Sequence, residues 1–239
     1  RAARVMCEEQ GECSRLRCRY HGWTYDLTGK LRGIPEFDGV EEFRREDHGL
    51  VPLAVACWGS FVWVHAGSAH VTLDSWVAPL VRRGLDESMA ALRFVARKEY
   101  RLQCNWKVFV DNYLDGGYHV NSVHPGLASV IDYSQYRTEI DEHASIQISP
   151  LQGSASSEEV SSVRQGDTAY YAWLFPNFMI NLYQGVMDTN LVLPEGPDAC
   201  RVLFDFYFAE TEGESAQKYI QRSIEVAHQI QLEDVGICE

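Results

Sequence analysis

The sequence predicts an α+β protein in two parts, a small β-rich segment over residues 1–70 and a larger α+β domain over residues 71–239. Short apolar runs separated by Gly and Pro predict the first part. In the second part, several strand-like runs and a long amphipathic segment predict a mostly antiparallel sheet with flanking helices.

The net charge and the apolar pattern exclude two classes of partner. The net charge of −13 argues against nucleic acid and against an anionic membrane surface. No apolar run approaches the length of a membrane span. The seven Cys follow no disulfide-scaffold spacing, which indicates a reducing compartment. Because the first residue is not Met and the last residues read as mid-helix, we expect both ends to be truncated.

The elements follow from the local patterns in chain order. The run "LVPLAVACWGSFVWVHAG" predicts strands, and residues 71–97 predict a helical connector with Asp74 as N-cap. The stretch "EYRLQCNWKVFVDNYLDG" runs from a strand into a helix, and residues 137–208 contain several strands. The last helix is predicted by apolar residues near helical spacing, namely Tyr219, Ile220, Ile224, Ala227, Ile230 and Val235.

Two pairs of metal-binding side chains stand out. Cys18 and His21 have C-x-x-H spacing and precede Gly-Trp and the strand-turn-strand pattern "TYDLTGKL". His119 and His124 are five residues apart, which lets two imidazoles converge near a helix end. An arbitrary C-x-x-H is more often a buried Cys beside a surface His, and an arbitrary H-x4-H is more often two unrelated histidines. The surrounding strings change this balance.

Taken in order, these strings resemble the catalytic (alpha) subunits of Rieske non-haem iron oxygenases. The resemblance makes residues 1–70 a partial Rieske domain, in which Cys18 and His21 are half of the ligands of a [2Fe–2S] cluster. It places the missing C-x-H immediately before Arg1. Residues 71–239 would then be a C-terminally truncated catalytic domain.

The string "NWKVFVDNYLDGGYHVNSVHPGL" resembles the mononuclear iron motif of the same family. The resemblance implies Fe(II) bound by His119, His124 and one carboxylate from the late helix, with positions left open for O₂. Asp234 is the expected ligand and Glu233 the alternative. Both could instead be solvated helix charges, as most acidic residues of helices are.

One position departs from the family pattern. Ring-hydroxylating members place an acidic residue three positions before the first His ligand, where it bridges to the Rieske histidine of a neighbouring subunit. Here that position is Gly116. On an ideal helix, the side chain of Asp115 would point about 100° away from it. Asp111, Asn112 and Asp115 are therefore the candidate catalytic residues of this motif, with the bridge left open.

The substrate prediction depends on the branch of the family and on aromatic residues. "DNYLDGGYHV" and "FPNFMINLYQGVMDTNLVLP" resemble the branch that oxidises choline and related methylated ammonium compounds. A cation–π contact is worth about 0.5–2 kcal/mol, and a negative protein attracts a cation. The candidate contacts are Tyr171, Trp173, Phe178 and Tyr183, although most strand aromatics belong to the core. The alternatives are an aromatic-ring dioxygenase and a non-catalytic module with degenerate metal sites.

The resemblance also implies partners. A reductase or ferredoxin would deliver electrons from NAD(P)H, O₂ would be the co-substrate, and the subunit would form a homotrimer. The expected compartment is the cytoplasm, or the plastid stroma if the source is a plant. No nucleic acid or membrane partner is expected.

Overall fold

The computed structural model describes residues 11–67, 72–151 and 162–239. The chain divides into two compact units, the first made of Arg1–Ala56 with Val62–Ala69 and the second of Cys57–Phe61 with His70–Glu239. Among the helices of the described residues, none is long and apolar enough to cross a membrane.

The first unit is built from short strands, as the sequence predicts. A three-stranded antiparallel sheet has the order β1-β2-β3, and a short 3-10 helix, η1, follows it along the chain. The hairpin β4-β5 forms a separate two-stranded sheet, and its residues Cys57–Phe61 are counted with the second unit. The bounds are β1 Leu16–Arg17, β2 Thr24–Tyr25, β3 Leu31–Gly33, η1 Arg45–His48, β4 Ala54–Trp58 and β5 Phe61–His65.

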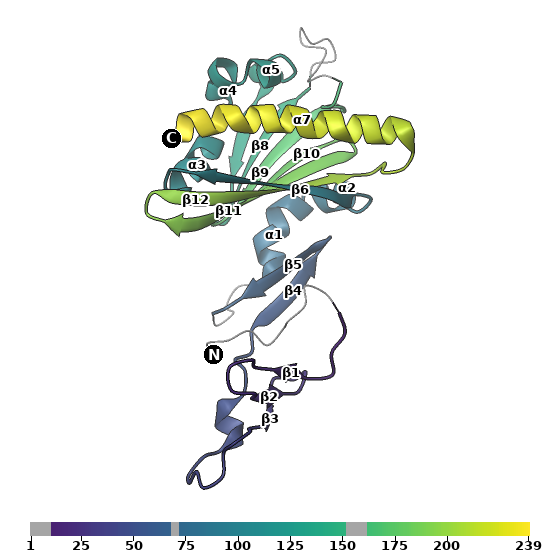
Figure 1. The fold of residues 1–239 in the computed structure, drawn as a ribbon. Helices are drawn as coiled ribbons and strands as arrows, with labels where there is room; N and C mark the ends of the chain where they lie inside the picture. The colour runs from purple at the N-terminus through teal and green to yellow at the C-terminus, as the bar shows by residue number, and fades with distance from the viewer. Residues whose placement is uncertain (1–10, 68–71, 152–161) are drawn as a thin grey trace. The chain divides into compact units, whose positions relative to one another are not determined.

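A seven-stranded sheet forms the body of the second unit (Figure 1). Its strand order is β6-β12-β11-β10-β9-β8-β7, and every neighbouring pair is antiparallel. The strands are β6 Arg93–Leu102, β7 Arg137–Ile140, β8 Ala144–Pro150, β9 Thr168–Leu174, β10 Phe178–Tyr183, β11 Val186–Gly196 and β12 Ala199–Phe208. The predicted α+β class with an antiparallel sheet is confirmed.

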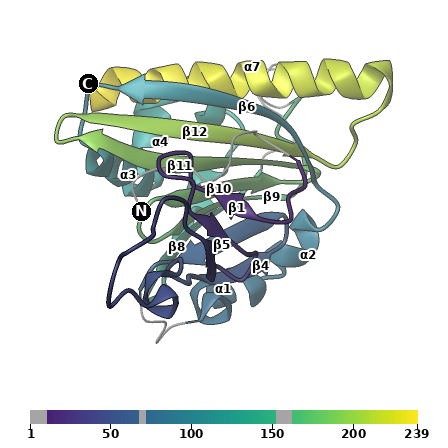
Figure 2. The same ribbon diagram turned by 60° about the horizontal axis from the view of Figure 1, so that its bottom comes forward.

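The longest helix, α7, runs along one face of this sheet, and α3 packs against β11, β12 and α7 (Figures 1 and 2). The helix α1 lies on the other side of the sheet and contacts β8 and β9. The bounds are α1 Leu73–Val81, α2 Leu85–Met89, α3 Trp106–Leu114, α4 Gly117–Val123, α5 Pro125–Ala128, the 3-10 helix η2 Tyr133–Gln135 and α7 Gly213–Cys238.

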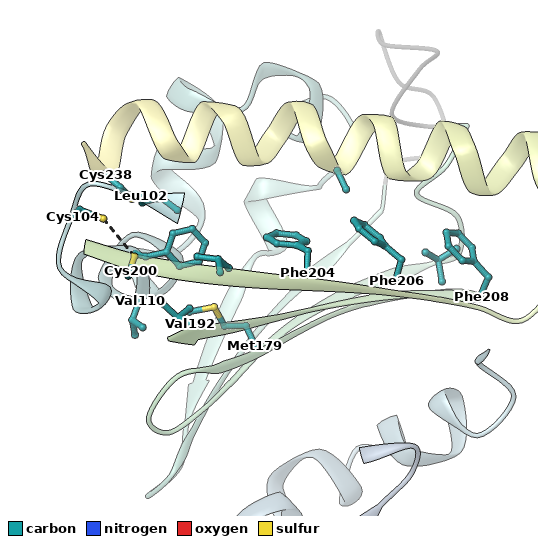
Figure 3. Packing of buried hydrophobic residues seen from close by; sticks show 14 of the residues in the cluster. Leu102, Cys104, Val110, Met179, Val192, Cys200, Phe204, Phe206, Phe208 and Cys238 are labelled. Atoms are coloured by element: carbon teal, nitrogen blue, oxygen red, sulfur yellow. Dashed lines mark hydrogen bonds between the residues drawn. The ribbon is translucent and has the colours of Figure 1, made fainter. Parts of the chain in front are cut away.

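The core between α7 and the sheet follows from the alternation of side chains along the strands. Phe204, Phe206 and Phe208 of β12 all point to the α7 side (Figure 3), since residues i, i+2 and i+4 of a strand share one face. From α7, Ile220 and Ala227 pack against this row. Each such fully buried large side chain contributes about 1.5–3 kcal/mol of hydrophobic stabilisation.

Three thiols lie together at one end of this core. Cys104 and Cys200 have their sulfur atoms 3.9 Å apart, and Cys238 of α7 lies near them (Figure 3). Burial raises the pKa of Cys200 and of Cys238 to about 12. These thiols are therefore protonated at neutral pH and pack as small apolar side chains.

The structure corrects the prediction for the connector. Residues 71–97 are not helical throughout, because helix ends at Met89 and β6 begins at Arg93. The charged residues that obscured β6 are tolerated because it is an edge strand, and Arg97 pairs with Asp205 of β12 at 2.6 Å. The N-cap of α1 is Thr72 rather than Asp74, since the Thr72 hydroxyl accepts a hydrogen bond from the backbone N–H of Ser75.

Candidate functional site

Two consecutive glycines separate α3 from α4, and each is required for a different reason. Gly116 has φ 77° and ψ −167°, a backbone conformation that is essentially restricted to glycine. At Gly117, a Cβ atom would lie 2.8 Å from the ring of Tyr133. The ideal-helix angle of about 100° therefore does not apply between Asp115 and position 116, because α3 ends at Leu114 and α4 begins at Gly117.

This break between the helices carries both predicted histidines to the sheet. His119 lies on α4 and is half-buried, and His124 follows the last residue of α4 and is buried. Their ring centroids are 5.5 Å apart, and the ring planes make an angle of 75°. Pro125 begins α5 directly after His124, so the second imidazole sits at a helix boundary.

Helix α7 brings both candidate carboxylates to His124. Oδ1 of Asp234 lies 3.1 Å from Nε2 of the imidazole, and Oε2 of Glu233 lies 2.8 Å from Nδ1. The side chain of Asn112 on α3 donates a hydrogen bond to the same Oδ1 of Asp234, at 2.8 Å. Side chains of α7 therefore meet the imidazole of His124 from more than 100 residues away in sequence, and α3 contacts one of them.

The electrostatics of the two histidines differ. Burial lowers the pKa of His119, and the neighbouring His124 lowers it further. Burial also acts to lower the pKa of His124, but Asp234 and Glu233 outweigh it and the pKa is raised. In the described residues, Nδ1 of His119 has no partner with hydrogen-bond geometry, although the carbonyl of Gly116 lies close enough to oppose the fall in pKa.

The side chains of His119, His124 and Asp234 are of the types that bind a divalent first-row metal. Two imidazoles and one carboxylate are the ligands of the non-haem Fe(II) facial triad. Two ligand atoms at about 2.1 Å from a metal and at right angles to each other lie about 3.0 Å apart, close to the 3.1 Å between His124 and Asp234. No group of three His, Cys, Asp or Glu side chains among the described residues already converges on one metal-sized position.

A cavity of about 100 Å³ adjoins these residues. Both histidines, Asn112 and Asp234 line it, whereas Glu233 is not among the lining residues. An apolar cavity of about 150 Å³ holds benzene, so this space suits a small ligand. The cavity is the place where a substrate would meet the histidines.

The predicted aromatic residues divide between the two faces of the sheet. Tyr171 and Tyr183 line the cavity, and their hydroxyls are 3.1 Å apart. Trp173 shares their face but packs against the core under α7. Phe178 is an odd number of residues from Tyr183 on β10, so it lies on the opposite face, where its ring meets Phe61 at 5.3 Å. Trp173 and Phe178 therefore lie outside the cavity.

Asp111 and Asp115 also lie outside the cavity lining, and both are exposed. Asp115 is close enough to act on His119, because its charge raises the pKa of that histidine. Of the predicted catalytic residues, only Asn112 contacts a candidate metal ligand directly.

A buried polar network, which was not predicted from the sequence, also lines the cavity. The hydroxyl of Tyr113 donates to Oδ1 of Asn181 at 2.9 Å, and Asn181 donates to Asp188 at 2.6 Å. Arg164 and Gln231 line the same cavity. The available signal was the pair Asp188 and Asn190, which are charged or amide side chains at alternate positions in the buried first half of β11.

In the first unit, Cys18 and His21 occupy the tight loop between β1 and β2. The backbone N–H of Cys18 donates to the carbonyl of Trp23 at 2.8 Å, and that of Gly22 donates to the carbonyl of Cys18 at 3.0 Å. Cys18 is partly exposed and His21 is exposed. The predicted C-x-H before Arg1 lies outside the described residues.

Comparison with protein families agrees with this geometry. Residues 89–239 match the ring hydroxylating alpha subunit (catalytic domain), and residues 1–44 match the Rieske [2Fe-2S] domain. The chain belongs to the family of Rieske oxygenase alpha subunits. These two domains imply an iron–sulfur cluster and a non-haem iron.

Within the family, the chain is similar to proteins named as monooxygenases of choline and carnitine. The chain is 41% identical to the chloroplastic choline monooxygenase of Arabidopsis thaliana, over 99% of its own length and 58% of that protein. It is 27% identical to the carnitine monooxygenase oxygenase subunit of Acinetobacter pittii, over 85% of its length and 56% of that protein. It therefore spans little more than half of the curated relatives that it matches.

Solved structures show the same fold. A quaternary ammonium Rieske monooxygenase, described in connection with carnitine oxidation by gut microbiota, superposes with a TM-score of 0.82 at 25% identity, covering 99% of this chain and 64% of that one. Naphthalene 1,2-dioxygenase from Rhodococcus sp. superposes with a TM-score of 0.72 at 19% identity, covering 99% and 64%. The second likeness concerns the fold alone.

Proposed function

We propose that the chain is the core of a Rieske-type oxygenase that hydroxylates a small quaternary ammonium compound such as choline. The observation that carries this proposal is the meeting of His119, His124 and Asp234 beside one small cavity lined by Tyr171 and Tyr183. The relatives named for choline and carnitine monooxygenases support the substrate class.

The residues of the second unit have distinct roles in this proposal. His119, His124 and Asp234 hold the iron, which when bound supplies the activation of O₂. Asn112 orients Asp234 through its hydrogen bond to Oδ1. Glu233 accepts a hydrogen bond from Nδ1–H of His124 and so leaves Nε2 unprotonated and able to bind the metal.

The substrate side of the cavity is built from neutral phenols. Burial raises the pKa of Tyr171 well above its ordinary value, and it also raises the pKa of Tyr183. Their rings therefore remain neutral and offer electron-rich faces to a methylated ammonium group. Such a group has no N–H to donate, so hydrogen bonds cannot identify it.

The first unit supplies the electrons in this proposal. Residues 1–70 form the Rieske domain, with Cys18 and His21 as half of the cluster ligands, and residues 71–239 form the catalytic domain. Asp115 is the favoured bridge to a neighbouring subunit, because it is exposed and its charge acts on His119. Asp111 is the alternative bridge.

The remaining partners are those of the family. A reductase or ferredoxin delivers electrons from NAD(P)H, and the subunits form a homotrimer. The plastid stroma is the proposed compartment, because the curated choline monooxygenase relatives are chloroplastic.

The proposal is tested with the full-length protein, loaded with iron and cluster and supplied with a reductase. We expect substrate-dependent O₂ consumption with choline, carnitine or a betaine, and none with naphthalene. The neutral isostere 3,3-dimethylbutanol, which keeps the shape of choline without its charge, should compete at least about tenfold less well. Equal competition would overturn the quaternary ammonium assignment, and turnover of naphthalene would favour an aromatic-ring dioxygenase. A loaded protein without iron at the second site would indicate a non-catalytic module.

A further inference from the structure

A buried arginine faces the candidate substrate cavity. Arg164 is 6% exposed and lines the cavity, and it is the only Lys or Arg among the lining residues in the described part of the chain. Burying a guanidinium is costly unless acceptors surround it. Its partners therefore show whether it serves only the fold.

The described partners leave the guanidinium incompletely satisfied. One face stacks on the ring of Tyr183, with Cζ 4.4 Å from the ring centroid. Nη2 lies 3.7 Å from Oδ1 of Asp188, which is an ion pair but too long for a hydrogen bond. Nε is buried and has no hydrogen-bond partner among the described residues. Of the five N–H donors of an arginine, at least this one therefore lacks an acceptor.

Asp188 is a weak counter-ion for Arg164. Its Oδ2 already accepts a hydrogen bond from Asn181 at 2.6 Å. Burial raises the pKa of Asp188, against the opposing effects of Arg164 and Asn181. Asp188 can contribute at most one negative charge, and it makes no hydrogen bond to the guanidinium.

We infer that Arg164 binds a carboxylate of the substrate, so that the substrate class is a methylated ammonium compound that also carries a carboxylate. This inference rests on the proposed function, because it assigns the same cavity to the substrate. A carboxylate matches the fork of a guanidinium with two parallel hydrogen bonds. It would give unpartnered Nε an acceptor.

The charge balance of the cavity favours the same class. Two neutral imidazoles, a divalent metal, Asp234 and Glu233, which lies 2.8 Å from His124, would sum to zero, while Arg164 and Asp188 cancel each other at best. A cation without a carboxylate would add one positive charge to this balance, whereas a zwitterion would not. Arg164 also occupies one face of Tyr183, which leaves less aromatic surface for a cation alone.

Four ligands of matched shape test the inference by calorimetric binding to the loaded full-length protein without O₂. Glycine betaine and choline carry the ammonium group, while 3,3-dimethylbutanoate and 3,3-dimethylbutanol are their isosteres with an uncharged tert-butyl head. We expect each carboxylate to bind about 10- to 100-fold more tightly than its alcohol partner. If neither carboxylate is preferred in the wild-type protein, the inference is overturned without any variant.

Variants connect the preference to Arg164. In Arg164→Gln combined with Asp188→Asn, which leaves no unpaired buried charge, both carboxylate-to-alcohol ratios should fall close to one. Arg164→Lys should keep part of the preference, because the charge remains and the fork is lost. The control pair Arg82→Gln with Asp141→Asn removes an exposed ion pair of the same residue types and should change neither ratio. The double variant of Arg164 and Asp188 should melt like the wild type, which shows that it is folded. If the preference for carboxylates is then unchanged both in it and in Arg164→Lys, the carboxylate binds elsewhere, for example on the metal, and the inference is overturned.

The same four ligands separate this inference from the proposed function. The ammonium group is tested by choline against 3,3-dimethylbutanol and by glycine betaine against 3,3-dimethylbutanoate. A preference for carboxylates without a preference for ammonium supports the role of Arg164 and refutes the quaternary ammonium substrate. The reverse result refutes the role of Arg164 and leaves the proposed function in place.

Discussion

Asp234 and Glu233 are adjacent in sequence, yet they meet different atoms of one imidazole. Asp234 approaches Nε2 of His124, and Glu233 approaches Nδ1. A metal-binding histidine uses one nitrogen as ligand and donates a hydrogen bond from the N–H of the other to an acceptor. The structure therefore supports Asp234 as the ligand and Glu233 as the residue that orients the ring.

The two carboxylates should respond differently to neutral replacement. Asp234→Asn should abolish binding of the mononuclear iron, since it removes a charged ligand. Glu233→Gln should weaken iron binding about 10- to 100-fold, and excess iron should restore occupancy. Iron titration of the full-length variants measures both effects. If Glu233→Gln abolishes binding and Asp234→Asn is restored by excess iron, the two roles are exchanged.

At the scale of elements, the break between α3 and α4 positions the histidines. The backbone of Gly116 adopts φ 77° and ψ −167°, and no atom lies within 4 Å of a Cβ placed there. Substitution would therefore act through backbone strain and not through a steric clash. At Gly117 the opposite holds, because the ring of Tyr133 fills the space.

Gly116→Ala should destabilise the protein by about 1–3 kcal/mol, because alanine does not adopt this conformation readily. The melting temperature should fall by about 2–4 °C for each kcal/mol, and iron occupancy should fall as His119 shifts. Gly236→Ala is the matched control, since Gly236 lies in α7 with open space around it. The control should be neutral or stabilising by up to about 1 kcal/mol. Wild-type melting and iron content in Gly116→Ala would contradict the strain argument.

At the scale of the whole molecule, the two candidate metal centres belong to different compact units. Cys18 and His21 lie in the first unit, and His119, His124 and Asp234 lie in the second. The predicted ligands within the described residues therefore come, for each centre, from a single unit. Loss of one centre should therefore leave the other one assembled.

Three variants of the full-length protein test this independence. His21→Ala should remove the visible spectrum of the iron–sulfur cluster and keep the mononuclear iron, while His119→Ala should do the reverse. Asp115→Asn should keep both centres and slow turnover, if Asp115 carries electrons between subunits. Absorption spectra, iron content and single-turnover rates distinguish the three. Loss of both centres in either histidine variant would show that the two units depend on each other.

The sequence alone determined those features that depend on short-range patterns. Strand alternation and helical periodicity identified the antiparallel sheet and α7, because each pattern is set by side chains within one element. The candidate metal-binding side chains of "CRYHGW" and "YHVNSVHP" were singled out by their spacing and assigned through the resemblance of the surrounding strings to Rieske oxygenases, and this assignment stays a prediction. The prediction of a helical connector was wrong over β6, whose charged residues resemble those of a helix. The pairing of β6 with β12 leaves no pattern in the sequence of β6 itself.

Only the tertiary structure decided which distant residues share the cavity. Arg164, Asp188 and Gln231 come from separate segments, and no local pattern places them in one cavity with His119. The tertiary structure also decided which strand aromatics reach the cavity. Tyr171 and Tyr183 lie on the cavity face of β9 and β10, whereas Phe178 lies on the opposite face of β10. The physical reason is that burial, charge pairing and the choice between Asp234 and Glu233 depend on how α7 packs across the sheet, and this packing involves contacts more than 100 residues apart in sequence.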